Sequence, residues 1–119
     1  MRKSDLMWIL QSSDAEGGPF TFRATAGAVK TVGRAPRADF IVEAALVSRL
    51  HCRLEVADEG IDVIDLSSTN GTFVNGARIE RARLQSGDVL HVGRVRLRVE
   101  RVQGADSRSP SVSGAGSGD

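Results

Sequence analysis

Short runs of alternating apolar and polar residues, separated by turn-forming residues, constrain the fold of this chain most strongly. In the segment 94–102, arginines separate Val95, Leu97 and Val99, so that every second side chain is apolar. A period of two residues is typical of a strand with one buried face, whereas an amphipathic helix needs a period of 3.6. Because such runs recur between Gly, Asn, Asp, Ser and Pro, the sequence predicts an all-β sandwich of two antiparallel sheets.

The predicted strands are short and cover most of the chain. They span 6–12, 20–25, 29–33, 39–43, 50–57, 60–66, 72–74, 77–80, 88–93 and 94–102. The segment 50–57 alternates as regularly as the last strand, so Leu50, Cys52, Leu54 and Val56 are expected to share its buried face. Aromatic residues make up only 4% of the chain and tyrosine is absent, so Val, Ile and Leu must fill the core.

Two segments depart from simple alternation. Between Val63 and Ile64 the apolar phase slips, which predicts a strand that is either bulged or covered on both faces. Residues 44–47 (AALV) are apolar, but Ser48 follows before any helical period develops. We therefore expect this segment to be a loop.

The length of 119 residues suits one compact domain. We expect an N-terminal extension at 1–5, the folded domain at 6–102 and a flexible tail or linker at 103–119, where Ser and Gly prevail and apolar side chains are almost absent. A signal peptide and a membrane-spanning run are not recognisable in the sequence. The expected location is cytoplasmic, or also nuclear in a eukaryote.

Charge and composition weigh against several classes of function. The chain carries 16 basic and 15 acidic residues, which argues against a general nucleic-acid binder, so the arginines at 94, 96 and 98 are interpreted as a solvated sheet face. The single cysteine, Cys52, excludes an internal disulfide and a cysteine-rich metal site. With only two histidines and no recognisable nucleophile and acid–base set, we expect no enzyme activity, no metal and no cofactor.

Three turn-like segments nevertheless hold residues suited to binding an anion. In the first, a strand ends at Gly33 and the guanidinium of Arg34 follows. In the second, the Ser48 hydroxyl lies beside the charge of Arg49, and His51 is expected to brace the loop from beneath. Taken alone, Gly33-Arg34 is better explained by a plain turn with a solvated arginine, and none of these segments is specific by itself.

The third segment, 67–72 (SSTNGT), crowds hydroxyl residues around an Asn-Gly pair. Such a turn offers hydroxyl and amide donors together with backbone N–H groups, which suits a phosphate and a peptide backbone. A second Asn-Gly pair at Asn75 and Gly76 is explained by a tight hairpin turn.

The order and spacing of these segments closely resemble the signature of the forkhead-associated (FHA) family. The matching residues are Gly33-Arg34, Ser48-x-x-His51, Thr69-Asn70-Gly71-Thr72-Phe73-Val74-Asn75-Gly76 and Leu84-x-x-Gly87-Asp88-Val89-Leu90-x-Val92-Gly93. The resemblance covers roughly residues 6 to 102. It implies an FHA/SMAD-like β-sandwich that binds phosphothreonine peptides through loops at one end.

The resemblance also implies roles for individual residues. Arg34 and Ser48 would contact the phosphate, Arg49 would add a further phosphate contact, Thr69 would line the pocket and Asn70 would bind the peptide backbone just after the phosphothreonine. Gly33, His51 and Gly71 would be architectural. The implied partner is a phosphothreonine-containing protein in a Ser/Thr kinase pathway, and neither nucleic acid nor membrane is expected as a partner.

In this family, the loop before the Ser-x-x-His motif often reads the third residue after the phosphothreonine. Here that loop offers Leu46 and Val47, so we expect an aliphatic residue to be preferred there over an acidic one. The main alternative is phospho-independent association or self-association through a sheet face or edge.

Overall fold

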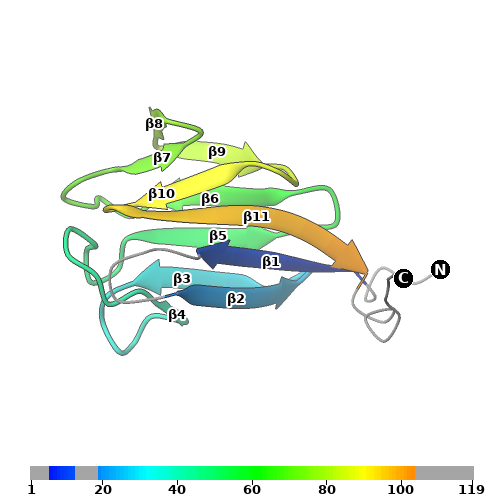
Figure 1. Ribbon diagram of the computed structural model, residues 1–119, viewed down its shortest axis with the longest axis horizontal. Helices are drawn as coiled ribbons and strands as arrows, with labels where there is room; N and C mark the ends of the chain where they lie inside the picture. Colours follow the sequence, from blue (N-terminus) through cyan, green and yellow to red (C-terminus); the bar gives the residue numbers. More distant parts are fainter. Residues whose placement is uncertain (1–5, 13–18, 104–119) are drawn as a thin grey trace.

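A computed structural model describes residues 6–12 and 19–103, and these residues form strands joined by turns and loops (Figure 1). The strands are β1 (Leu6–Ser12), β2 (Phe20–Thr25), β3 (Val29–Gly33), β4 (Phe40–Ile41), β5 (Cys52–Val56), β6 (Ile61–Asp65), β7 (Thr72–Val74), β8 (Ala77–Ile79), β9 (Arg81–Leu84), β10 (Val89–Val92) and β11 (Val95–Gln103). The described residues contain no helix. The predicted all-β class is confirmed.

The strands form two sheets that pack face to face. One sheet has six strands in the order β2-β1-β11-β10-β7-β8, and the other has five in the order β4-β3-β5-β6-β9. Their pairings are antiparallel except for β3 with β4, which run parallel. The loops after β3, β4 and β6 gather at one end, away from the start of β1 and the end of β11 (Figure 1).

The core between the sheets is mainly aliphatic, as the composition predicts. Leu54, Val63, Leu90 and Leu97 are all completely inaccessible to solvent. Each such side chain contributes roughly 1.5–3 kcal/mol through removal of apolar surface from water. Trp8 and Phe40 are its buried aromatic members. The indole Nε1–H of Trp8 donates to the Ala57 carbonyl at 2.8 Å, so its polar atom is not left unpaired.

The two strongest alternations predict burial correctly. In β11, Val95, Leu97 and Val99 are buried and the arginines between them are exposed. In β5, Cys52, Leu54 and Val56 are buried in the same way. The prediction is wrong only for Leu50, which precedes the strand and is half-buried, because the chain is still in the loop at that residue.

Strand β6 resolves the slip in alternation at Val63 and Ile64. Its pairing with β5 is regular, residue for residue, so the strand has no bulge. Val63 lies in the core, while Ile64 is half-buried on the outer face. The inward phase therefore continues from Ile61 and Val63 to Asp65, which carries a carboxylate to the edge of the core.

Other local predictions vary in accuracy. Residues 44–47 form a loop as expected, and Asn75 (φ 51°) with Gly76 (φ 88°) forms the tight turn between β7 and β8. Strand β9 was not predicted, because Arg81-Ala82-Arg83-Leu84 offers one small and one large apolar residue as its alternating pair. The expected extension at 1–5 and the tail lie outside the described residues, except for Gln103, the end of β11.

Candidate functional site

The site begins where β3 ends, at a glycine for which a side chain has no room. A Cβ atom built on Gly33 would lie 2.0 Å from the Arg49 carbonyl oxygen. The two segments are this close because the Arg34 N–H donates to the Ser48 carbonyl at 3.0 Å and the Ala35 N–H donates to the Arg49 carbonyl at 3.1 Å. Gly33 thus allows the first two predicted segments to run side by side.

Arg34 projects from this junction with its guanidinium partly anchored. Its Nε–H donates to the Val47 carbonyl at 2.9 Å. The two terminal nitrogens make no hydrogen bond within the described part of the chain, so they remain available to a ligand. A guanidinium fixed at Nε retains two outward donors, which is the geometry for bidentate binding of an oxyanion.

His51 joins the second and third segments from beneath. It is completely buried, its Nδ1 accepts the Ser48 N–H at 3.0 Å, and its Nε2 lies 2.8 Å from the Gly71 carbonyl. This pattern assigns the proton to Nε2, which donates to Gly71. A neutral histidine therefore holds the Ser48 loop and the turn at Gly71 at a fixed separation.

Ser48, Thr69 and Asn70 meet above this brace. The Ser48 Oγ accepts the Thr69 N–H at 3.0 Å, so its own hydroxyl proton is still free to donate. The Asn70 Nδ2 donates to the Leu46 carbonyl at 3.1 Å, which leaves the Asn70 Oδ1 free to accept. Leu46 has a positive φ of 72°, which lies in the left-handed region that side chains rarely adopt.

Asp65 supports the third segment from the end of β6. Its carboxylate accepts the Ser68 hydroxyl at 2.5 Å and the Thr72 hydroxyl at 2.6 Å, and the Ser68 Oγ in turn accepts the Gly71 N–H at 3.0 Å. Burial alone would raise the pKa of Asp65, but the hydrogen bonds from Ser68 and Thr72 outweigh it and lower the pKa below its ordinary value. The carboxylate is therefore charged at neutral pH.

These loops enclose a surface cleft of about 810 Å³. Its lining residues are Arg34, Pro36, Glu43, Ala44, Ala45, Leu46, Val47, Ser48, Thr69 and Asn70. The structure thus brings together most of the predicted site residues. Sequence reasoning missed Glu43 and Pro36, although both lie in the loops that carry the other lining residues.

Leu46 and Val47, the predicted specificity residues, differ in accessibility. Leu46 is 45% exposed, while Val47 is only 3% exposed and belongs to the core. Leu46 is therefore the aliphatic side chain that a ligand in the cleft can contact.

Arg49 does not line this cleft. It borders a separate hollow of about 290 Å³ together with Ala35, Arg37 and Leu50. Its sequence-based assignment to the phosphate held by Arg34 stays a prediction.

Other chemistry-bearing groups lie apart from the cleft. Burial, reinforced by the nearby negative charge of Asp65, raises the pKa of the Cys52 thiol to about 12, so the thiol is protonated at neutral pH. Across 6–12 and 19–103, no group of three or more His, Cys, Asp or Glu side chains is arranged to hold a metal ion. A helix long and apolar enough to span a bilayer is likewise not found in these ranges.

Comparison with known proteins places this arrangement in a family. The family model described as "FHA domain" matches residues 30–93. The ABC transporter ATP-binding/permease protein Rv1747 of Mycobacterium tuberculosis is 41% identical over 80 residues, which cover 67% of this chain and 9% of that protein. The glycogen accumulation regulator GarA of the same species is 34% identical over 70 residues, covering 59% of this chain and 43% of GarA.

A solved structure agrees with the sequence comparisons. An FHA domain from a structural and functional analysis of phosphothreonine-dependent FHA domain interactions superposes with a TM-score of 0.67 and 29% identity. The match covers 80% of this chain and 94% of that one. The chain therefore corresponds to a nearly complete solved domain but to less than half the length of either curated relative.

Proposed function

This chain belongs to the FHA domain family, and on that premise we propose that it binds phosphothreonine-containing peptides in the cleft between Arg34, Ser48 and Asn70. One observation carries the proposal. The terminal nitrogens of Arg34, the hydroxyl proton of Ser48 and the Asn70 Oδ1 meet at the same cleft, and none of them is bound by another of the described residues. Arg34 and Ser48 can donate hydrogen bonds to a phosphate, and the Asn70 Oδ1 can accept one from a peptide N–H.

The charge of the ligand makes Arg34 the dominant contact. A phosphothreonine carries about −1.5 to −2 charges and three acceptor oxygens. Hydrogen bonds to charged groups contribute roughly 1.5–3 kcal/mol each, so loss of Arg34 should weaken binding about ten- to a hundredfold or more. An Asp or Glu residue offers less charge and a different oxygen geometry, and should be a poor substitute.

The other cleft residues take complementary roles in the proposal. Ser48 donates its hydroxyl to the phosphate, and Thr69 lines the pocket around the phosphothreonine. Asn70 uses its free Oδ1 to accept the backbone N–H just after that residue. The threonine methyl would add roughly 0.8 kcal/mol over phosphoserine if it is fully buried.

Ligand residues that follow the phosphothreonine would face a wall of the cleft that carries one apolar and one acidic side chain. Leu46 is exposed on this wall, and Glu43 lines the same cleft. Glu43 would repel an acidic ligand residue, so it adds an electrostatic reason for the preference expected from Leu46. We propose that Leu or Ile is favoured over Asp at the third residue after the phosphothreonine.

The proposal makes this chain a binding module in Ser/Thr kinase signalling and not an enzyme. Its FHA relatives include proteins named as regulators, among them the glycogen accumulation regulator GarA. The partner would be a phosphothreonine protein, and the proposed location is the cytoplasm.

Fluorescence polarisation against an oriented peptide library tests the proposal. The library contains phosphothreonine, phosphoserine and unphosphorylated versions of each peptide, and Arg34→Ala is measured in parallel. We expect binding that requires phosphothreonine and falls at least tenfold with Arg34→Ala. Binding that ignores phosphate or Arg34 would overturn the proposal and favour phospho-independent association through a sheet face.

A further inference from the structure

A second hollow with two arginines lies beside the phosphate cleft. Arg37 and Arg49, both exposed, line it together with Ala35 and Leu50, and its volume is about 290 Å³. The hydrogen bond from the Ala35 N–H to the Arg49 carbonyl at 3.1 Å holds the two segments that carry these arginines together. The hollow and the cleft share no lining residue, so they are separate sites.

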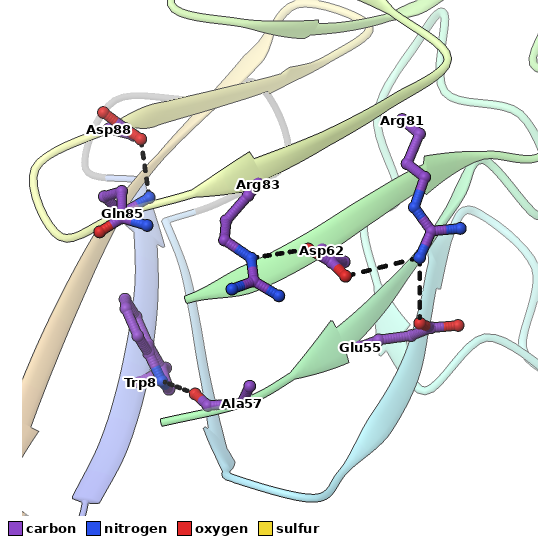
Figure 2. Close-up of polar contacts among 8 residues, drawn as sticks. All are labelled: Trp8, Glu55, Ala57, Asp62, Arg81, Arg83, Gln85 and Asp88. Atoms are coloured by element: carbon purple, nitrogen blue, oxygen red, sulfur yellow. Dashed lines mark hydrogen bonds and ion pairs between the residues drawn. The ribbon is translucent and has the colours of Figure 1, made fainter. Parts of the chain in front are cut away.

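The charges of this hollow are not neutralised by any residue that the structure describes. Neither Arg37 nor Arg49 has a side-chain hydrogen bond or ion pair with any residue in the described ranges. Two arginines of β9 behave differently: Figure 2 shows Arg81 and Arg83 turned towards the carboxylate of Asp62, with N–O distances of 3.5 and 2.9 Å. An anion in the hollow would be attracted by two guanidinium groups that have no partner among the described residues.

The hollow also lies within reach of a peptide held in the cleft. Arg49 follows Ser48 directly in the chain, and Ala35 follows Arg34. Consecutive Cα atoms are about 3.8 Å apart, and an extended peptide advances roughly 3.3–3.6 Å per residue. A ligand residue a few positions from the phosphothreonine can therefore reach Arg37 and Arg49.

We propose that Arg37 and Arg49 form a second anion subsite, which binds another phosphate or a carboxylate on the same phosphothreonine peptide. The proposal rests on the function proposed above. It defines the ligand class more narrowly: peptides that carry a second negative group at a fixed distance from the phosphothreonine. A phosphate is the preferred group, because its three oxygens satisfy two guanidinium forks better than a carboxylate does.

A positional scan by fluorescence polarisation tests the subsite. One phosphothreonine peptide is held constant, and phosphoserine, Asp or Ala is placed at each of the four positions on either side. We expect phosphoserine to tighten binding about five- to tenfold over Ala at one or two neighbouring positions, with a smaller gain for Asp, since exposed ion pairs are weak. If no position gains from either anion, the second subsite is overturned.

Variants separate this proposal from the function on which it rests. Arg37→Gln should reduce the gain to about twofold or less while keeping the affinity for the singly phosphorylated peptide. The matched control is Arg23→Gln, which removes from β2 an exposed arginine with no partner among the described residues and should keep the full gain. If the second anion still tightens binding after Arg37→Gln, the subsite is contradicted. If the unaltered protein binds the peptide without phosphothreonine, the proposed function itself is contradicted.

Discussion

The outer face of the five-stranded sheet and the loop end of the sandwich use the same residue types in opposite ways. On the sheet face, Arg81 and Arg83 bind Asp62, and Arg81 also approaches Glu55 at 3.7 Å (Figure 2). At the loop end, Asp65 binds hydroxyl groups, and Arg34 keeps its terminal nitrogens free. Arginines are therefore neutralised by the protein in one region and left for a ligand in the other.

One strand produces this difference. Asp62 and Asp65 both belong to β6, but they lie on opposite phases of its alternation. Asp62 points outward, where the arginines of the neighbouring β9 reach it, while Asp65 lies on the inward phase at the base of the loops. The number of arginines in a region thus says little about anion binding until the partners of its carboxylates are known.

The largest effect is expected from Gly33→Ala, which places a methyl group where β3 and the Arg49 backbone approach most closely. The new Cβ would lie 2.0 Å from the Arg49 carbonyl oxygen, so the end of β3 and the loop at Arg49 must separate. We expect a loss of about 2–4 kcal/mol in unfolding free energy and weakening of peptide binding by more than tenfold. Urea denaturation and fluorescence polarisation measure the two effects.

Gly76→Ala is the matched control, because its Cβ would meet nothing within 4 Å. Its positive φ of 88° should cost only about 1 kcal/mol. Peptide binding should not change. Equal loss of binding in the two variants would show that the close approach at Gly33 does not shape the site.

A smaller effect is expected from Asp65→Asn, which removes the charge beneath the third segment. Hydrogen bonds to a charged group are stronger than those to an amide, so we expect a loss of about 1–2 kcal/mol in unfolding free energy near pH 7, with weaker peptide binding. Because the native pKa of Asp65 is lowered, its contribution is present above the ordinary value of 3.8 and is lost as the pH falls through the native pKa.

Denaturation of both proteins between pH 7 and pH 2 therefore measures this contribution. The difference in stability between them should be constant at neutral pH and should shrink below about pH 4. A difference that persists unchanged to pH 2 would mean that packing, and not the charge, makes Asp65 important.

The smallest effect is expected from Asp62→Asn on the outer sheet face. The hydrogen bond from Arg83 is the main cause of the lowered pKa of Asp62, yet Asp62 is partly accessible to solvent and both its arginine partners are exposed. Surface ion pairs contribute about 0–1 kcal/mol, so stability should fall by less than that, and peptide binding should not change. A clear loss of phosphopeptide affinity in this variant would remove the distinction between the two regions.

The sequence predicts the sandwich well and the site only in part. Strands such as β5 and β11 are predictable because a strict period of two leaves one way to bury Leu54 or Leu97. Strand β9 was missed because its inward residue Ala82 is small and its pattern consequently weak. Its assignment requires the pairing of β9 with β6, which sequence alone does not supply.

The sequence also does not predict the directions in which loop side chains point. Arg49 follows Ser48 in the chain, yet it borders a different hollow, which the sequence does not indicate. Glu43 lines the cleft although four residues separate it from Ser48. Such placements depend on contacts between loops, which local sequence patterns do not encode.

The most direct test is an amide chemical-shift titration of the ¹⁵N-labelled protein with one phosphothreonine peptide and its unphosphorylated twin. The loop end and the outer sheet face are then observed in a single experiment. We predict that shifts concentrate at residues 33–36, 43–50 and 67–72, that β9 and the outward residues of β6 stay unchanged, and that the unphosphorylated peptide has no effect. Shifts centred on β6 and β9, or equal shifts with both peptides, would contradict a phosphate site at the loop end.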